Sequence, residues 1–226
     1  MTEGVWQALL VTLQLAGVTT LILLIIGLPL AWWLSGMTSR IRPVLEALVG
    51  LPMVLPPTVL GFYLLVAFSP NNPLGQFWLK LTGSSLAFSF HGLVVASVIY
   101  SLPFVVQPLQ RAFEQINRGL LEAAATLGAG PIDRFVSVVL PQTFRPLLLA
   151  ASLGFAHTVG EFGVVLMIGG NIPGKTQVLS IALYDAVETQ NLASAHLISG
   201  GLIGFALVLL TGLYALDYGP NRRDGR

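Results

Sequence analysis

The chain has 226 residues, of which 54% are hydrophobic and only 9% are charged, and its formal net charge is +1. Soluble domains carry roughly 25% charged residues, so this composition excludes a water-soluble globular protein and predicts a polytopic membrane protein. The charge shows no basic excess for nucleic acid, and the absence of cysteine excludes disulfides and thiolate metal sites.

Five apolar stretches are long enough to cross a bilayer, which needs about 20 helical residues. They cover approximately residues 9–34, 44–68, 91–109, 146–169 and 195–218. The first belongs to a charge-free run from Val5 to Leu34 that is too long for the core of a secretory signal, so we expect it to be retained in the membrane. We therefore predict an all-α membrane protein with one domain over residues 1–226.

The basic residues are distributed unequally between the two sides of the predicted membrane. Only Lys80 and Lys175 lie on one side, whereas the other side holds Arg40, Arg42, Arg111, Arg118, Arg134, Arg145, Arg222, Arg223 and Arg226. Because positive residues stay cytoplasmic, we expect the N-terminus outside and the C-terminus in the cytoplasm. Tryptophan and tyrosine residues near the span ends, at positions 6, 32, 33, 78, 214 and 218, are typical of membrane interfaces.

Prolines interrupt the second apolar stretch. Pro56 and Pro57 each remove a backbone donor, and their rings clash with the preceding helical turn. A helix from Arg42 would reach this break after about 20 Å, near or just past the bilayer centre. Transporters place broken helices along their translocation paths, so we interpret Pro56, Pro57 and Thr58 as path-lining residues. A packing kink that does not contact substrate is the alternative.

The segment from Ser69 to Phe90 begins with the turn-forming sequence SPNNPLG and continues with QFWLKL. We expect a short interfacial helix here, or the edge of a sixth element that enters the bilayer. The segment from Thr176 to Leu192 is too short to span twice, and we expect it to be helical along the outer face.

Residues 111–145 form a long polar segment between the third and fourth apolar stretches. Alanine and leucine favour a helix from about Gln115 to Leu127, and the glycines that follow break it. Pro131 suits the first turn of a new helix. We therefore predict two short helices joined by a compact turn and projecting into the cytoplasm. A solvated linker is the alternative.

The sequence EAAATLGAGPIDRFVSVVLP, from Glu122 to Pro141, resembles the signature of permease subunits of binding-protein-dependent ABC importers. That signature is E-A-A, three residues, G, nine residues and I-x-L-P, and only Val138 departs from it. The resemblance implies that residues 111–145 form a coupling loop that docks in a groove on a separate ATPase subunit. The docking residues that it implies are Glu122, Ala123, Ala124, Leu127, Gly128, Ala129, Leu140 and Pro141.

Two further stretches, LPMVLPPTVLGFYLL and GEFGVVLMIGGNIPGKT, are similar to the molybdate permeases of that family. The resemblance covers most of the chain and implies a type I ABC importer permease fold with five transmembrane helices, or six. It also implies a bacterial cytoplasmic membrane location and a homodimer. The implied partners are ATPase subunits that bind ATP and Mg, and a periplasmic or extracellular oxyanion-binding protein. The chain itself is implied to bind no cofactor and to catalyse no reaction.

Other cargoes and another class of transporter remain open at this stage. Sulfate and tungstate are alternative cargoes, because a path that binds weakly discriminates poorly between tetrahedral oxyanions of equal charge. A secondary transporter or channel would need no ATPase, but neither repeat halves nor several intramembrane charges are visible.

Glu161 is the only acidic residue well inside an apolar stretch, and His157 lies four residues earlier on the same helix face. A buried carboxylate has a partner or is protonated. We interpret the two residues as a structural pair. Alternatively, His157, Glu161, Phe162 and Gly163 form part of a gate near the path. The sequence HTVGE is not the zinc-protease motif H-E-x-x-H.

The sequence GGNIPGKT, from Gly169 to Thr176, satisfies the phosphate-loop pattern G-x-x-x-x-G-K-[ST]. The predicted topology places this sequence outside the cytoplasm, where no ATP is available, and it follows a membrane span and not a sheet strand. We therefore interpret Asn171, Pro173 and Gly174 as part of a rigid extracytoplasmic loop.

Overall fold

The computed structural model describes residues 2–217 of the chain. These residues form helices and connecting turns, and no strand occurs among them. Tyr218, Arg222, Arg223 and Arg226, which entered the predicted orientation, lie outside the described residues. The helices are α1 (Thr2–Ser35), α2 (Arg42–Val54), α3 (Pro57–Phe68), α4 (Pro73–Thr82), α5 (Phe90–Glu114), α6 (Arg118–Thr126), α7 (Pro131–Arg134), the π-helix η1 (Phe135–Val139), α8 (Leu140–Gln142), α9 (Phe144–Gly160), α10 (Gly163–Gly169), α11 (Leu179–Glu188) and α12 (Leu192–Asp217).

Helices α1, α5 and α12 are each long and apolar enough to cross a membrane. Two bent pairs of helices pass the same test together, so the described chain offers three to five spans. The first pair is α2 with α3, and the second is residues 131–142 with α9. The five predicted apolar stretches are therefore all helical, but only three of them are single continuous spans.

The second stretch breaks where the prolines predict. Helices α2 and α3 meet at an angle of 106°. Leu55 and Pro56 both have extended backbone, with ψ of 137° and 134°. Each precedes a proline, and the proline ring disfavours the helical conformation of the residue before it. Pro57 then starts α3, where its missing N–H leaves no hydrogen bond unmade.

The fourth stretch, which we predicted as one span over residues 146–169, is broken as well. Helix α9 ends at Gly160, and α10 begins at Gly163. Between them Glu161 has an extended backbone with ψ of 135°, and Phe162 has φ of −125°. No proline marks this break, so the apolar composition of the stretch concealed it.

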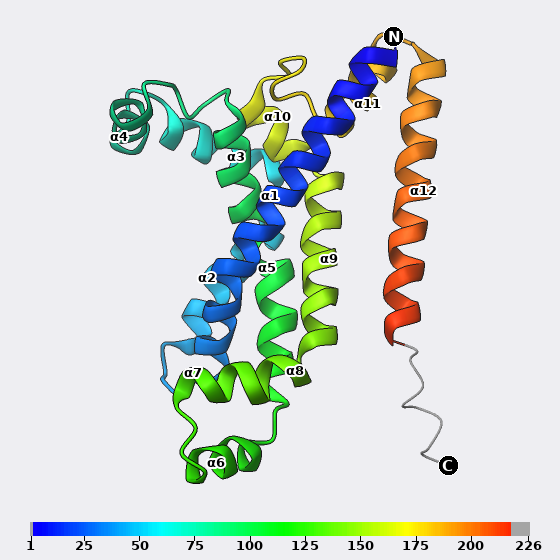
Figure 1. Cartoon of the computed structure of the whole chain (residues 1–226). Coiled ribbons are helices and arrows are strands. Elements are labelled where there is room, and N and C mark those ends of the chain that lie inside the picture. Colours follow the sequence, from blue (N-terminus) through cyan, green and yellow to red (C-terminus); the bar gives the residue numbers. More distant parts are fainter. Residues whose placement is uncertain (1, 218–226) are drawn as a thin grey trace.

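The core of the bundle is built from α1, α5 and α9, which lie side by side (Figure 1). Val105 of α5 is fully buried between two glycines of the neighbouring helices. A Cβ atom on Gly154 of α9 would lie 2.7 Å from the Val105 side chain, and one on Gly27 of α1 would lie 3.3 Å from it. Any larger residue at Gly154 would push α9 away from α5.

The two predicted peripheral helices are present. Helix α4 has 10 residues, which is too short to cross a bilayer, so the sixth element that we considered is not a further span. Helix α11 also has 10 residues and lies at the same end of the molecule as the N-terminus (Figure 1). Helix α12 lies at the edge of the bundle, and only 6% of its most apolar window is buried.

Candidate functional site

Helix α6 and the turn after it project from the end of the bundle opposite to α4 and α11 (Figure 1). The side chain of Asn117 caps α6 by accepting a hydrogen bond of 2.9 Å from the backbone N–H of Gly119. None of the residues in α6 is buried. This part of the chain is thus a helix with its side chains exposed, and not a solvated linker.

Gly128 ends α6 in a left-handed turn. Its φ is +90°, which favours glycine. The N–H of Gly128 donates to the carbonyl of Ala125, and the N–H of Ala129 donates to the carbonyl of Ala124, each at 3.0 Å. This pair of bonds is the Schellman arrangement, and it satisfies carbonyl groups that the helix end would otherwise leave without partners. The compact turn predicted after Leu127 is confirmed.

Two large apolar side chains flank this turn and are open to solvent. Leu127 is 89% exposed, and Ile132 at the start of the next helix is 81% exposed. Apolar residues presented this far into water are typical of a protein interface. Leu127 directly precedes the motif glycine and was among the predicted docking residues, whereas Ile132 was not.

The two halves of the signature have different surroundings. Glu122, Ala123 and Gly128 are exposed, and Ala124 and Ala129 are half-buried. Leu140 and Pro141 lie at the far end of the next helix, where the neighbouring Val139 is fully buried in the bundle core. Residues 122–129 therefore form an exposed surface. In the second half of the signature Val139 is buried in the core, Leu140 is half-buried and Pro141 is exposed.

Three aromatic side chains also attach the loop to the end of α1. The ring of Trp32 at the end of α1 lies 5.4 Å from the rings of both Phe113 and Phe135, in edge-to-face arrangements. Such pairs stabilise by about 0.5–1.5 kcal/mol beyond the area that they bury. Phe113 lies near the end of α5, before α6, and Phe135 directly follows α7. The three rings therefore hold the chain on both sides of α6 against α1.

The break between α2 and α3 lies beside the break between α9 and α10. A Cβ atom on Gly163, the first residue of α10, would lie 2.6 Å from the Cβ of Pro57, the first residue of α3. Farther along the same contact, a Cβ atom on Gly61 would lie 2.8 Å from the Cβ of Met167. The structure therefore brings together the predicted path residues Pro56, Pro57, Thr58, Glu161, Phe162 and Gly163.

Glu161 and His157 do not pair with each other among the described contacts; each contacts a different hydroxyl group of α5. Glu161 is 5% exposed, and one carboxylate oxygen accepts a hydrogen bond of 3.3 Å from Ser97. His157 Nδ1 lies 2.9 Å from Ser101 Oγ, and the ring stacks on Phe104. The pairing fails because α9 ends at Gly160, so the side chain of Glu161 leaves the face that an unbroken helix would share.

Glu161 also anchors the break through its backbone. The Ser180 hydroxyl of α11 donates a short hydrogen bond of 2.5 Å to the Glu161 carbonyl, which α9 leaves free. The second carboxylate oxygen of Glu161 is buried without a partner among residues 2–217. A buried oxygen of this kind is costly to leave unsatisfied, and such positions are held by a functional or conformational requirement.

The GGNIPGKT loop is rigid, but it does not form a phosphate cradle. The N–H groups of Lys175, Thr176 and Gln177 all point to the carbonyl of Ile172, at 3.1, 2.9 and 3.0 Å. In a phosphate loop these donors face the ligand instead. Asn171 adopts a left-handed φ of +57°, and its side-chain amide donates to Asp185 at 2.8 Å. Pro173 and Gly174 are exposed at the tip of the loop, as predicted.

The family described as "Binding-protein-dependent transport system inner membrane component" matches residues 8–218. The chain is 55% identical over 208 residues to the "Molybdenum transport system permease protein ModB" of Azotobacter vinelandii, covering 92% of both chains. It is 35% identical to the "Sulfate transport system permease protein CysT" of Salmonella typhimurium, covering 94% of this chain and 76% of the relative.

The fold is also similar to a solved structure. A bacterial ABC transporter involved in the import of the acidic polysaccharide alginate aligns with a TM-score of 0.72 and 18% identity. The alignment covers 99% of this chain and 81% of that chain. At this low identity the similarity concerns the fold alone.

Proposed function

Because the chain belongs to the inner-membrane components of binding-protein-dependent transport systems, we propose that it is the permease subunit of a molybdate importer. The observation that carries the cargo assignment is the much higher identity to a molybdenum permease than to a sulfate permease. As a permease, the chain is a transport subunit and not an enzyme. ATP and Mg belong to a separate ATPase subunit in this proposal.

In this proposal the N-terminus is outside, so α6 and its turn lie in the cytoplasm and the GGNIPGKT loop lies outside. The arginines support this orientation, since Arg118, Arg134 and Arg145 all belong to the part of the chain around α6 and α9. Lys80 lies in α4, at the opposite end of the bundle. The ATPase then meets the exposed residues from Glu122 to Ala129, with Leu127 and Ile132 as its apolar anchors.

The functional unit in this proposal is a homodimer. Of the residues of α2 only Pro52 is buried, and of α3 only Gly61 and Phe68. Large apolar side chains on these two helices are open instead, among them Leu48, Val54, Phe62 and Tyr63. A second copy related by twofold symmetry would cover this surface and complete a pore of which one chain forms half.

The translocation path runs past the paired breaks at Pro56 and Phe162. Irregular backbone at membrane depth is tolerated where it is buried in protein or lines a cavity, and two adjacent breaks provide such a place. The buried Ser97 and Ser101 are already hydrogen-bonded to Glu161 and His157, so they do not form a strong oxyanion site. Weak binding suits conduction, and selectivity then belongs to the extracytoplasmic binding protein.

ATP binding draws the ATPase subunits together and carries the two coupling loops with them. Rigid-body movement of the helices then opens the path outward, and hydrolysis returns it to the inward state. The chain contributes geometry alone to this cycle and breaks no covalent bond.

The test is reconstitution of the permease with its ATPase and its binding protein in proteoliposomes. We expect molybdate uptake that requires ATP and the binding protein and that excess sulfate does not inhibit. Equal uptake of sulfate would assign the sulfate branch instead. Uptake without ATP would contradict the whole proposal and indicate a secondary transporter.

A further inference from the structure

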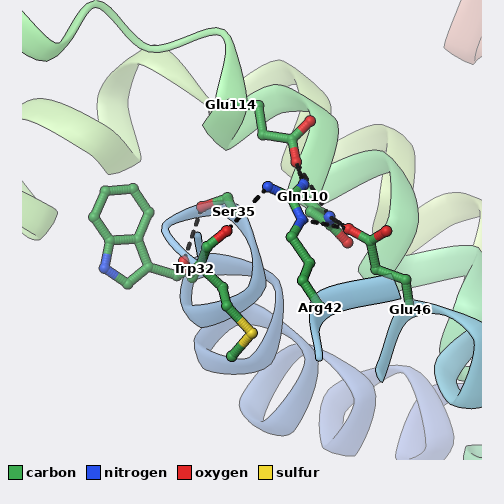
Figure 2. Close-up of polar contacts among 7 residues, drawn as sticks. Trp32, Ser35, Arg42, Glu46, Gln110 and Glu114 are labelled. Atoms are coloured by element: carbon green, nitrogen blue, oxygen red, sulfur yellow. Dashed lines mark hydrogen bonds and ion pairs between the residues drawn. The ribbon is translucent and has the colours of Figure 1, made fainter. Parts of the chain in front are cut away.

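Four polar side chains meet where the start of α2 approaches the end of α5, and we call Arg42, Glu46, Gln110 and Glu114 the polar cluster (Figure 2). Arg42 is the first residue of α2, and Glu114 is the last residue of α5. These two residues are 72 positions apart in the sequence.

The guanidinium of Arg42 joins three segments of the chain. Its Nε donates to Glu46 at 2.7 Å, within α2. A second nitrogen forms an ion pair with Glu114 of α5. The third donates to the carbonyl of Met37, in the connection after α1, at 3.3 Å. This fork of donors in fixed directions is available to arginine and not to lysine.

Gln110 completes the cluster from one turn earlier on α5. Its amide donates to Glu46 at 2.6 Å and to Glu114 at 3.1 Å. Gln110 is buried, whereas the side chains of Arg42 and Glu114 are 29% and 35% exposed. The buried amide of Gln110 thus fixes the positions of the two carboxylates, and the partly exposed ion pair between Arg42 and Glu114 holds α2 against α5.

The surroundings of the polar cluster allow the contact to open. A cavity of about 340 Å³ adjoins it, lined by the cluster residues together with Val49, Gln107 and Arg111. At the polar cluster itself, separating α2 from α5 exposes polar groups that water can solvate, whereas Leu45 and Val49 of α2 pack against the apolar core beside it. A contact between apolar side chains would resist the same separation through its buried area.

The polar cluster lies between α6 and the helix that leads to the break at Leu55 and Pro56. Glu114 lies three residues before Asn117, the residue that caps α6. A displacement of the start of α6 therefore also displaces Glu114. Arg42 begins α2, and α2 runs directly to the break at Leu55 and Pro56. The cluster is therefore the polar link between the loop that contacts the ATPase and the broken span beside the path.

We propose that the polar cluster is a reversible latch that couples displacement of α6 to α2, with Arg42 as its positioning residue. This inference rests on the proposed function for its consequence in transport. Breaking the latch leaves the permease inserted and bound to its ATPase. It lets α6 move without carrying α2, so hydrolysis continues while less cargo crosses.

The first test measures molybdate uptake and ATP hydrolysis together in proteoliposomes that contain the complete transporter. For Arg42→Gln and Glu114→Gln we expect uptake per ATP to fall roughly two- to fivefold, the change typical of a partly exposed ion pair. The double variant should be no worse than the single ones, because both remove the same contact. Arg40→Gln is the matched control, since Arg40 is exposed and takes no part in the cluster.

A merely structural role predicts a different result. Uptake and hydrolysis would then fall in parallel, with an unchanged ratio of uptake to ATP hydrolysed. That result would overturn the latch.

The second test is independent of the cargo. The chain has no cysteine, so Val44→Cys and Gln115→Cys place spin labels at exposed positions on α2 and just after α5 without further changes. In detergent, Arg42→Gln should broaden the distance distribution between the labels, whereas Arg40→Gln should not. An unchanged distribution refutes the latch even if molybdate is the cargo, and a broadened one supports it even if the cargo is sulfate.

Discussion

The turn at Gly128 provides a substitution whose cost can be worked out from the structure. Gly128 has φ of +90°, and a Cβ atom added there would meet no other atom within 4 Å. Gly128→Ala therefore adds no clash and costs only the left-handed backbone, about 1–2 kcal/mol. That energy lowers the population of the intact turn by a factor of about 5–30. Gly128→Asn should cost less, because asparagine tolerates this region.

Gly128→Trp adds bulk to the same strain, and the bulk lies on the proposed docking surface. We expect the variant to insert normally, to lose copurification with the ATPase and to lose ATP-dependent molybdate uptake. Gly83→Trp is the matched control. Gly83 also ends a helix with a positive φ of 72° and open space around it, but it belongs to α4 at the opposite end of the bundle.

The assay is uptake in cells together with copurification of the ATPase, each normalised to the amount of permease in the membrane. We expect the asparagine variant to be mildest, the alanine variant intermediate and the tryptophan variant most severe. Normal uptake by Gly128→Trp, or equal loss in Gly83→Trp, would refute a docking role for this turn.

Three further substitutions test the path and the outer loop. Gly163→Val places its Cβ against Pro57 and separates the two breaks; we expect a loss of about 1–3 kcal/mol in stability, visible as a lower melting temperature in detergent, together with reduced uptake. Glu161→Gln keeps an oxygen for the Ser97 hydroxyl but removes the acid, so uptake should fall while the amount of inserted protein stays constant, and unchanged uptake and ATPase coupling would argue against a gate. Lys175→Ala should leave ATP hydrolysis by the complete transporter unchanged, since its loop forms no phosphate cradle; a loss of nucleotide binding would contradict this.

Local chemistry made two features of the fold predictable. Consecutive prolines restrict the backbone before them wherever they occur, so the break at Pro56 follows from the sequence alone. Glycine after an alanine-rich helix likewise predicts the turn at Gly128. Both features depend on neighbouring residues and need no knowledge of the tertiary structure.

Features that depend on distant contacts were not predictable. The break at Glu161 is stabilised by Ser97 and Ser180, which belong to other helices, and an apolar stretch without proline gives no sign of it. The contact between Pro57 and Gly163 joins residues more than one hundred positions apart. The link from Arg42 to Glu114 joins residues 72 positions apart. A single sequence shows the residue types at these positions but not which of them meet.

The most direct test of the account is the sidedness of the loop that contains Gly128. The absence of cysteine allows Leu127→Cys and Lys175→Cys to be made separately, and both positions are exposed. In spheroplasts, a membrane-impermeant thiol reagent should label cysteine at position 175 at once and cysteine at position 127 only after the membrane is permeabilised. Labelling of position 127 in intact spheroplasts, with position 175 protected, would contradict the orientation and with it the docking of an ATPase on α6.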